Sequence, residues 1–185
     1  PEDRAVTRPK QTSTPAQSAR DESPDEARAR PRSAPKARQD AISLRKEDHS
    51  KVKKMFKEFE KAAQGERNEE LMDDLVTRIC AELTLHTGAE EAILYPAARA
   101  AGIDPDLMDE ADVEHEGAKE LVGQLEKMRP GEDHYDAKVK VLGEYVEHHA
   151  DEEEDEMFPA IRKSGIDIKA LGQEILQFKQ RNSDN

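Results

Sequence analysis

The chain has 185 residues, of which 38% are charged and only 4% aromatic, and its formal net charge is -13. This length fits one domain with a tail, the scarcity of aromatic residues disfavours a large β-sandwich core, and the negative charge disfavours binding to nucleic acid. Cys80 is the single cysteine, which excludes an intramolecular disulfide, and no apolar run approaches the roughly 20 residues of a membrane span. The first residues form no apolar leader, so we expect a soluble cytoplasmic protein.

Residues 1–39 differ in composition from the rest of the chain. They are rich in proline, serine and arginine, and they contain nine basic against six acidic residues, a balance of about +3 that leaves about -16 for the remainder. Such a segment buries too little apolar surface to offset the entropy lost on ordering, so we predict that it is disordered. Its basic residues are scattered, which favours a solvated leader over a segment that binds nucleic acid, acidic lipid or its own domain.

From residue 40 onward, apolar residues recur every three or four positions, which is the pattern of amphipathic helices. Four long segments show this pattern: 41–63, 68–102, 105–129 and 133–165. Because the connections between them are short, the sequence predicts an all-α fold, an antiparallel up-down-up-down four-helix bundle over residues 40–165. Residues 166–185 would add a short amphipathic C-terminal helix that packs on the bundle or on a partner, through Ile168, Leu171, Ile175 and Phe178.

Each of the four segments has a gap in its apolar stripe, and a histidine fills every gap. These histidines are His49, His86, His115 and His149, and two of them are followed four residues later by a glutamate, Glu90 and Glu153. A spacing of four on a helix brings both side chains to one centre. A lone core histidine is usually an ordinary packed residue, but four in register favour metal binding. No Lys or Arg is expected on the stripes beside the two glutamates, so a metal cation is the simplest compensation for their buried charge.

An internal repeat supports the same site. The segment from His86 through Gly102 to Asp104 recurs from His149 at a constant offset of 63 residues. His49 and His115 precede the two copies, and each follows an acid, Asp48 and Glu114 respectively. Two helical hairpins related by a pseudo-two-fold axis would bring equivalent ligand sets face to face, which suits two metals with bridging carboxylates. Each copy also contains a proline, Pro96 or Pro159, which should kink the end of its helix.

The order of these motifs resembles the hemerythrin HHE family. The resemblance covers roughly residues 40–165 and includes Leu-Tyr-Pro after Glu90 and Met-Phe-Pro after Glu153. It implies a non-haem di-iron centre in which the four histidines are terminal ligands and the two glutamates bridge. The oxygen-carrying hemerythrins have a second histidine where this chain has Lys119, and an aspartate five residues after the last histidine in place of the Glu153 arrangement. The chain therefore resembles the broader HHE branch more than the respiratory carriers.

Three functions are compatible with such a site. The first is a protein that binds or senses O2, peroxide or NO at a di-iron centre, with a redox partner that the sequence does not identify. The second is an enzyme that consumes peroxide or NO, which sustained turnover would distinguish. The third is an interaction bundle in which the metal is only structural. The resemblance favours iron, while imidazole and carboxylate donors also suit zinc or manganese. We favour the first function and predict no dedicated catalytic residue.

Other polar and aromatic residues are assigned roles away from the metal. Surface positions are expected for His148, Glu91, Glu152 and Glu154, and a surface or helix-capping position for His134. Tyr145 is placed at the edge of the core, and Cys80 is expected to be an inert buried thiol. An apolar shell around the site is predicted from Phe56, Leu83, Leu142 and Val146.

Overall fold

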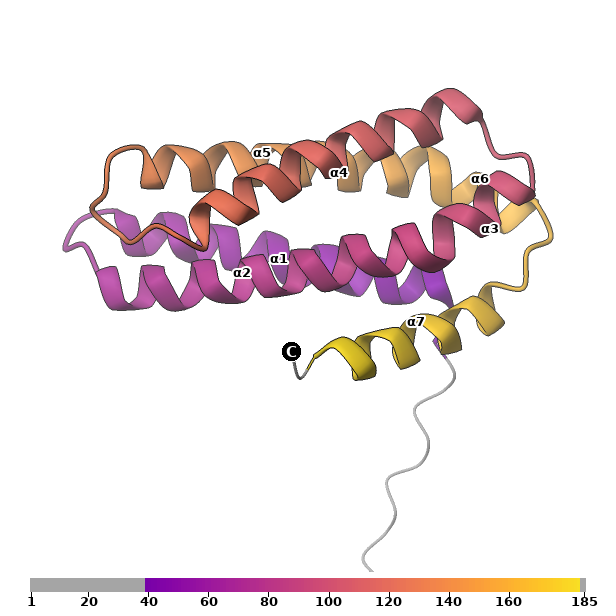
Figure 1. The fold of residues 1–185 in the computed structure, drawn as a ribbon, viewed down its shortest axis with the longest axis horizontal. Helices are drawn as coiled ribbons and strands as arrows, with labels where there is room; N and C mark the ends of the chain where they lie inside the picture. The colour runs from indigo at the N-terminus through magenta and orange to yellow at the C-terminus, as the bar shows by residue number, and fades with distance from the viewer. Residues whose placement is uncertain (1–38, 184–185) are drawn as a thin grey trace, which may run out of the picture. The chain divides into compact units, whose positions relative to one another are not determined.

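A computed structural model describes residues 39–183, and every regular element in that range is helical. Figure 1 shows four long arms running antiparallel, with a further helix lying beside them. The arms are α1 (Ala41–Ala63); α2 (Glu69–Ala89), continued by η1 (Glu90–Leu94) and α3 (Tyr95–Ala100); α4 (Pro105–Leu125); and α5 (Tyr135–Glu152), continued by η2 (Glu153–Met157) and α6 (Phe158–Lys163). The additional helix is α7 (Ile168–Asn182). The predicted four-helix bundle with a short C-terminal helix is confirmed.

The predicted disorder of residues 1–39 concerns a segment that lies, apart from Gln39, outside the described residues. Within the described range, no helix is both long and apolar enough to cross a membrane.

Polar side chains at the helix starts explain where the arms begin. The Asp40 carboxylate accepts a hydrogen bond from the backbone N–H of Ser43 at 2.9 Å, and the Asn68 side chain accepts one from Leu71 at 3.1 Å. These bonds satisfy N–H groups that have no partner inside the helix. Asp104 caps α4 in the same way, with Pro105 in the first turn as predicted. His134 occupies the N-cap of α5 in the left-handed region, with φ of 67°, and its side chain makes no capping bond.

The two prolines of the repeat follow π-helical segments. Pro96 follows η1 and Pro159 follows η2, and in each case the preceding N–H, of Tyr95 or Phe158, bonds to the carbonyl five residues back. A proline cannot donate a backbone bond and its ring crowds the carbonyl four residues earlier, which favours a wider turn just before it. The predicted disturbance of the helices is therefore a π turn, and it starts in both arms at the glutamate of the His-x-x-x-Glu pair.

The buried residues form two apolar clusters with a polar layer between them. One cluster, toward the α1–α2 turn, includes Val52, Leu75 and Leu142, and the other, toward α3 and α6, includes Ile42, Met108 and Phe158. The helix α7 packs on α1 and α2 and contributes Ile175 to the second cluster. The buried polar layer consists of Arg45, His49, His86, Thr87, Glu90, His115, His149 and Glu153.

Candidate metal centre

All six predicted donor residues lie in the buried layer, and they meet in the centre of the bundle. His49 comes from α1 and His115 from α4, while the pairs His86–Glu90 and His149–Glu153 come from the two repeated arms. Two groups of atoms are mutually close enough to hold a cation. One group is His49, His86, Glu90 and Glu153, and the other is Glu90, His115 and His149.

The Nε2 atoms of the histidines point at the two carboxylates. Nε2 of His86 lies 3.1 Å from Glu90 Oε2, and Nε2 of His49 lies 3.2 Å from Glu153 Oε2. On the other side, Nε2 of His115 is 3.5 Å from Glu90 Oε2 and 3.1 Å from Nε2 of His149. Glu90 therefore contacts histidines of both groups, as a carboxylate shared between two positions would.

The Nδ1 atom of each histidine faces outward to a different acid. Nδ1 of His49 lies 2.9 Å from Glu154, and Nδ1 of His115 lies 3.0 Å from Glu91. Nδ1 of His149 lies 2.7 Å from Glu114, and Nδ1 of His86 lies 3.4 Å from Asp48. Because an ionised carboxylate only accepts hydrogen bonds, this network assigns the proton to Nδ1 and leaves the Nε2 lone pair facing the centre. That is the tautomer that a metal-binding imidazole needs.

The role of two of these outer acids is a correction to the sequence interpretation. Glu91 and Glu154 are 35% and 29% exposed, in line with the predicted surface positions, but each also contacts Nδ1 of a histidine in another arm. Both acids directly follow the glutamate of a His-x-x-x-Glu pair, but the sequence does not show which histidine each of them meets. The expectation for His148 is confirmed, because its side chain is 64% exposed and lies 3.5 Å from Glu114.

Arg45 is the second correction, because a cation does lie on the buried stripe. Its side chain is fully buried, with Nη1 3.9 Å from Glu90 Oε1 and Nη2 2.8 Å from Asp48 Oδ2. Nη1 also donates to the carbonyl of His86 at 3.2 Å. Arg45 stands four residues before His49 and so shares its helix face. The equivalent position in the repeat, 66 residues later, is Ala111. One buried guanidinium thus offsets part of the charge of two carboxylates.

Tyr95 is a polar residue of the centre that sequence reasoning missed. Its hydroxyl donates to Glu153 Oε1 at 3.0 Å and lies 3.3 Å from Nε2 of His115 and 3.4 Å from Nε2 of His149. The equivalent residue in the repeat is Phe158, which stacks on His49 with ring centroids 5.9 Å apart. Tyr95 follows the π turn, so the wider turn rotates its ring toward the centre.

The pKa values of Glu90, Glu153 and His86 are shifted in different directions. Burial, together with the nearby Glu153, raises the pKa of Glu90 well above its usual range. Burial would also raise the pKa of Glu153, but the nearby imidazoles of His49, His149 and His86 hold it below its usual range. Burial lowers the pKa of His86 to about 3, against the opposing hydrogen bond to Asp48. His86 is therefore neutral at pH 7 and able to bind a cation through Nε2.

Several inward-facing atoms lack a hydrogen-bond partner. They include both oxygens of Glu90, Oε2 of Glu153 and Nε2 of His49, all of them buried. Although Nε2 of His49 and Oε2 of Glu153 are 3.2 Å apart, they are not aligned as a hydrogen bond. Unpaired buried oxygens are costly, and a cation among these atoms would satisfy several of them. The donor set therefore fits a metal ion on its own geometry.

Comparison with known proteins agrees with this geometry. The family described as hemerythrin HHE cation binding domain matches residues 40–161. The chain belongs to the hemerythrin HHE cation-binding family. The matched range contains all six predicted donors as well as Arg45 and Tyr95, and membership implies that this HHE domain binds metal cations.

Two proteins are similar to this HHE chain, one in structure and one in sequence. A crystal structure of a hemerythrin HHE cation binding domain-containing protein from Mycobacterium kansasii superposes with a TM-score of 0.65 at 25% identity, covering 79% of this chain and 89% of that one. A protein named DNA nickase from Nostoc sp. is 30% identical over 145 residues, which are 78% of this chain. The HHE chain spans 39% of the length of that Nostoc protein.

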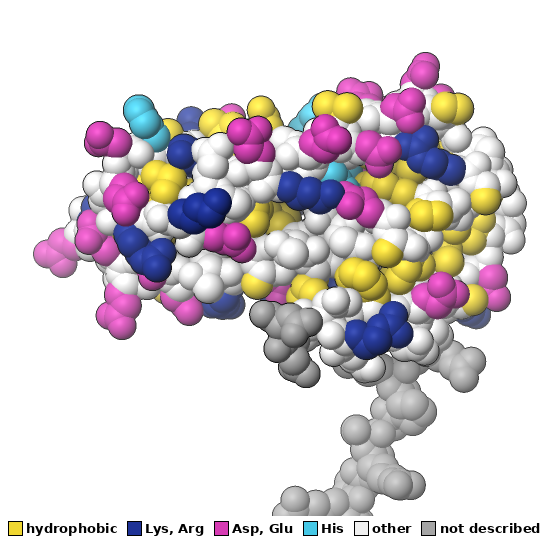
Figure 2. Space-filling view, in the orientation of Figure 1, with side chains coloured by type: hydrophobic (Ala, Val, Ile, Leu, Met, Phe, Trp, Pro, Cys, Tyr) yellow, Lys and Arg dark blue, Asp and Glu magenta, His cyan; other side chains and the backbone are white. Residues whose placement is uncertain are grey.

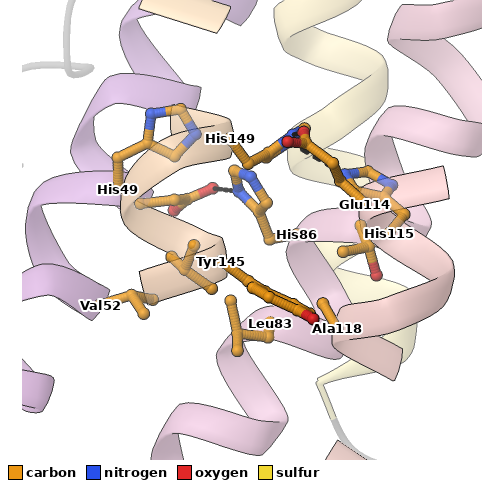
Figure 3. A pocket seen from close by; sticks show the side chains of 12 residues that line it. His49, Val52, Leu83, His86, Glu114, His115, Ala118, Tyr145 and His149 are labelled. Carbon is orange, nitrogen blue, oxygen red and sulfur yellow. Dashed lines mark hydrogen bonds and ion pairs between the residues drawn. The ribbon is translucent and has the colours of Figure 1, made fainter. Parts of the chain in front are cut away.

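A small cavity lies beside the histidines of the HHE centre (Figure 3). Its volume, counted as space open to the centre of a water molecule, is about 20 Å³, enough for one small molecule. Figure 3 shows Tyr145 lying between Leu83 and Ala118, on the side of the cavity away from the histidines. Leu83 and Val146 line the cavity as predicted, whereas Phe56 lines a groove between α1 and α5 and Leu142 is buried in the core. Tyr145 lines the cavity and is 47% exposed, so the cavity lies just beneath the surface.

Proposed function

We propose that this HHE domain holds two non-haem iron ions and uses them to bind O2, peroxide or NO. The observation that carries the proposal is the convergence of four Nε2 atoms and two carboxylates, several of them unpaired, on one buried centre. His49 and His86 would serve one ion, His115 and His149 the other, and Glu90 and Glu153 would supply carboxylate oxygens to the pair. Zinc and manganese accept the same donors, and family membership favours iron over them.

The side chains of the protein would prepare this centre in three ways. The outer acids Asp48, Glu91, Glu114 and Glu154 keep the proton of each histidine on Nδ1. The Tyr95 hydroxyl donates a hydrogen bond to Glu153, which fixes that carboxylate and places a proton donor at the centre. The cavity beside the histidines has room for one small molecule. When bound, iron would supply the redox chemistry that none of these side chains provides.

Other functions find less support. We do not propose DNA nicking, the activity in the name of the Nostoc protein, because this chain spans only 39% of that protein and has a net charge of -13. On the face shown in Figure 2, basic side chains are interspersed among acidic ones, unlike the basic stripe of a nucleic-acid binder. The helix α7, proposed as a partner surface, already packs on α1 and α2. An enzyme that consumes peroxide or NO at the same centre, and a cytoplasmic location, stay predictions.

The test is metal analysis of the purified protein together with its visible spectrum. We expect about two irons per chain, a charge-transfer band in air, and a change of that band when the anaerobically reduced protein meets NO or O2. The His86→Ala variant should lose iron, whereas His148→Ala, a surface histidine next to the site, should keep it. One zinc per chain without a visible band would refute the proposal. Repeated consumption of peroxide beyond one equivalent would identify an enzyme instead of a binder.

A further inference from the structure

Asp48 differs from the other three acids that hold the histidines. Its side chain is 12% exposed, against 18% for Glu114, 29% for Glu154 and 35% for Glu91. Glu91 and Glu154 pair with lysines of α4 and α1 that are about half exposed, Lys119 and Lys46. Pairs of that kind contribute little, because solvent screens them. The cations beside Asp48 are far less accessible, which makes their contact with it stronger.

Two cations from different helices hold the Asp48 carboxylate. Oδ2 lies 2.8 Å from Nη2 of the fully buried Arg45, and Oδ1 accepts a hydrogen bond from Nζ of Lys179, whose side chain is 21% exposed. The carboxylate is therefore fixed between two cations, and its Oδ2 lies 3.4 Å from Nδ1 of His86.

Lys179 reaches Asp48 only because α7 is tightly docked. Gly172 lies against the start of α1, where a Cβ atom would come within 2.4 Å of the Gln39 carbonyl. Ile175 is fully buried in the second apolar cluster, and the Phe178 ring covers Gly88 of α2, two residues after His86. Figure 1 shows α7 lying along the α1–α2 side of the bundle. The docked helix thus presents Lys179 to the acid that orients a candidate ligand.

We propose that Lys179 is a positioning residue of the metal centre, acting through Asp48 on His86, so that the docked helix α7 slows the loss of the ion held by His49 and His86. The inference rests on the proposed function, because it assigns different supports to the two ions. At the equivalent place in the repeat, Glu114 holds His149, and its second contact is the exposed His148. The two halves of the centre are thus supported differently, one by the C-terminal helix and one at the surface.

The experiment removes the lysine and keeps the helix. Lys179→Met retains the length of the side chain without its charge, Lys179→Arg restores a donor, and Lys169→Met removes an exposed lysine from the same helix as the matched control. The iron-loaded proteins are mixed with a chelator, and the release of iron is followed over time. In the metal-free proteins, nitrogen NMR of His86 reports which ring nitrogen carries the proton. Circular dichroism confirms that each variant is folded.

For Lys179→Met we expect about half of the iron to leave on the order of tenfold faster, the loss typical of a removed outer-shell contact. The His86 proton should also spread between Nδ1 and Nε2. Lys179→Arg should restore both readouts, and Lys169→Met should match the wild type. Release and NMR signals of Lys179→Met equal to those of Lys169→Met would overturn the proposal, and so would equal acceleration for both ions. A wild-type protein that takes up no metal would refute the proposed function instead, and the NMR readout would still test the link from Lys179 to His86.

Discussion

Replacing each buried glutamate with glutamine should change the stability of the metal-free protein in opposite directions. Glu90 is fully buried, has no hydrogen-bond partner for either oxygen, and has a raised pKa, so the metal-free fold keeps it protonated. Glu153 has a lowered pKa and accepts a hydrogen bond from Tyr95, so the fold keeps it ionised. Glutamine has the shape of the protonated acid, so it suits the first position and not the second.

The magnitude at Glu90 follows from proton linkage. Holding protonated at pH 7 an acid that has a pKa of about 4.3 when unfolded costs about 1.36 kcal/mol per pH unit, or at most about 4 kcal/mol. The partial compensation by Arg45, with Nη1 3.9 Å from Oε1, reduces this value. We expect Glu90→Gln to raise the free energy of unfolding of the metal-free protein by about 1–3 kcal/mol at pH 7, and by less at pH 5. Glu153→Gln should lower it by about 1.5–3 kcal/mol, the loss of a charged buried hydrogen bond.

Urea unfolding of chelator-treated protein at pH 5 and pH 7 measures both effects, and metal analysis of the same variants should show that each has lost iron. Glu91→Gln, at a half-exposed neighbouring position, is the control and should shift stability by less than either. If Glu90→Gln proved less stable than the wild type at pH 7, Glu90 would be ionised and paired with Arg45, and the reasoning on its protonation would be wrong.

Three further predictions concern Tyr95, Glu90 and Cys80. Tyr95→Phe should keep the fold, because Phe158 fills the equivalent position, but should weaken iron retention and shift the visible spectrum; an unchanged spectrum would show that the hydroxyl has no part in the centre. Metal affinity should rise with pH, because binding displaces the proton that the raised pKa keeps on Glu90, and calorimetry in buffers of different ionisation enthalpy should detect its release; no buffer dependence would contradict this. Burial raises the pKa of Cys80 to about 11, so the thiol should react with a thiol reagent at pH 8 only in denaturant; fast reaction of the native protein would disprove its burial.

The fold and the burial of the six candidate donors could be predicted from the sequence because both follow from one periodicity. A histidine in each apolar stripe, and a glutamate four residues after two of them, can be read without coordinates, and all six lie where the pattern placed them. Arg45 was missed because charged residues were assumed to face solvent, although its position four residues before His49 places it on the same face. Tyr95 was missed because the π turn changes the helical register just before it. The contacts of Glu91 and Glu154 with histidines could not be predicted, because the periodicity within one helix does not show which helices are neighbours.

The π turns also determine how each repeated arm would respond to losing a residue. A π turn contains one residue more than the α-helical turn it replaces, so deleting Ala92 would let η1 close into regular α-helix. The segment beyond the deletion would then turn by about 100° relative to α2. That rotation would carry the phenol ring of Tyr95 out of the bundle interior while His86 stayed in place. The Tyr95 hydroxyl therefore reaches the histidines only because the π turn adds one residue to the helix. Deleting Ala92 would separate Tyr95 from the histidines although all of these side chains would be retained.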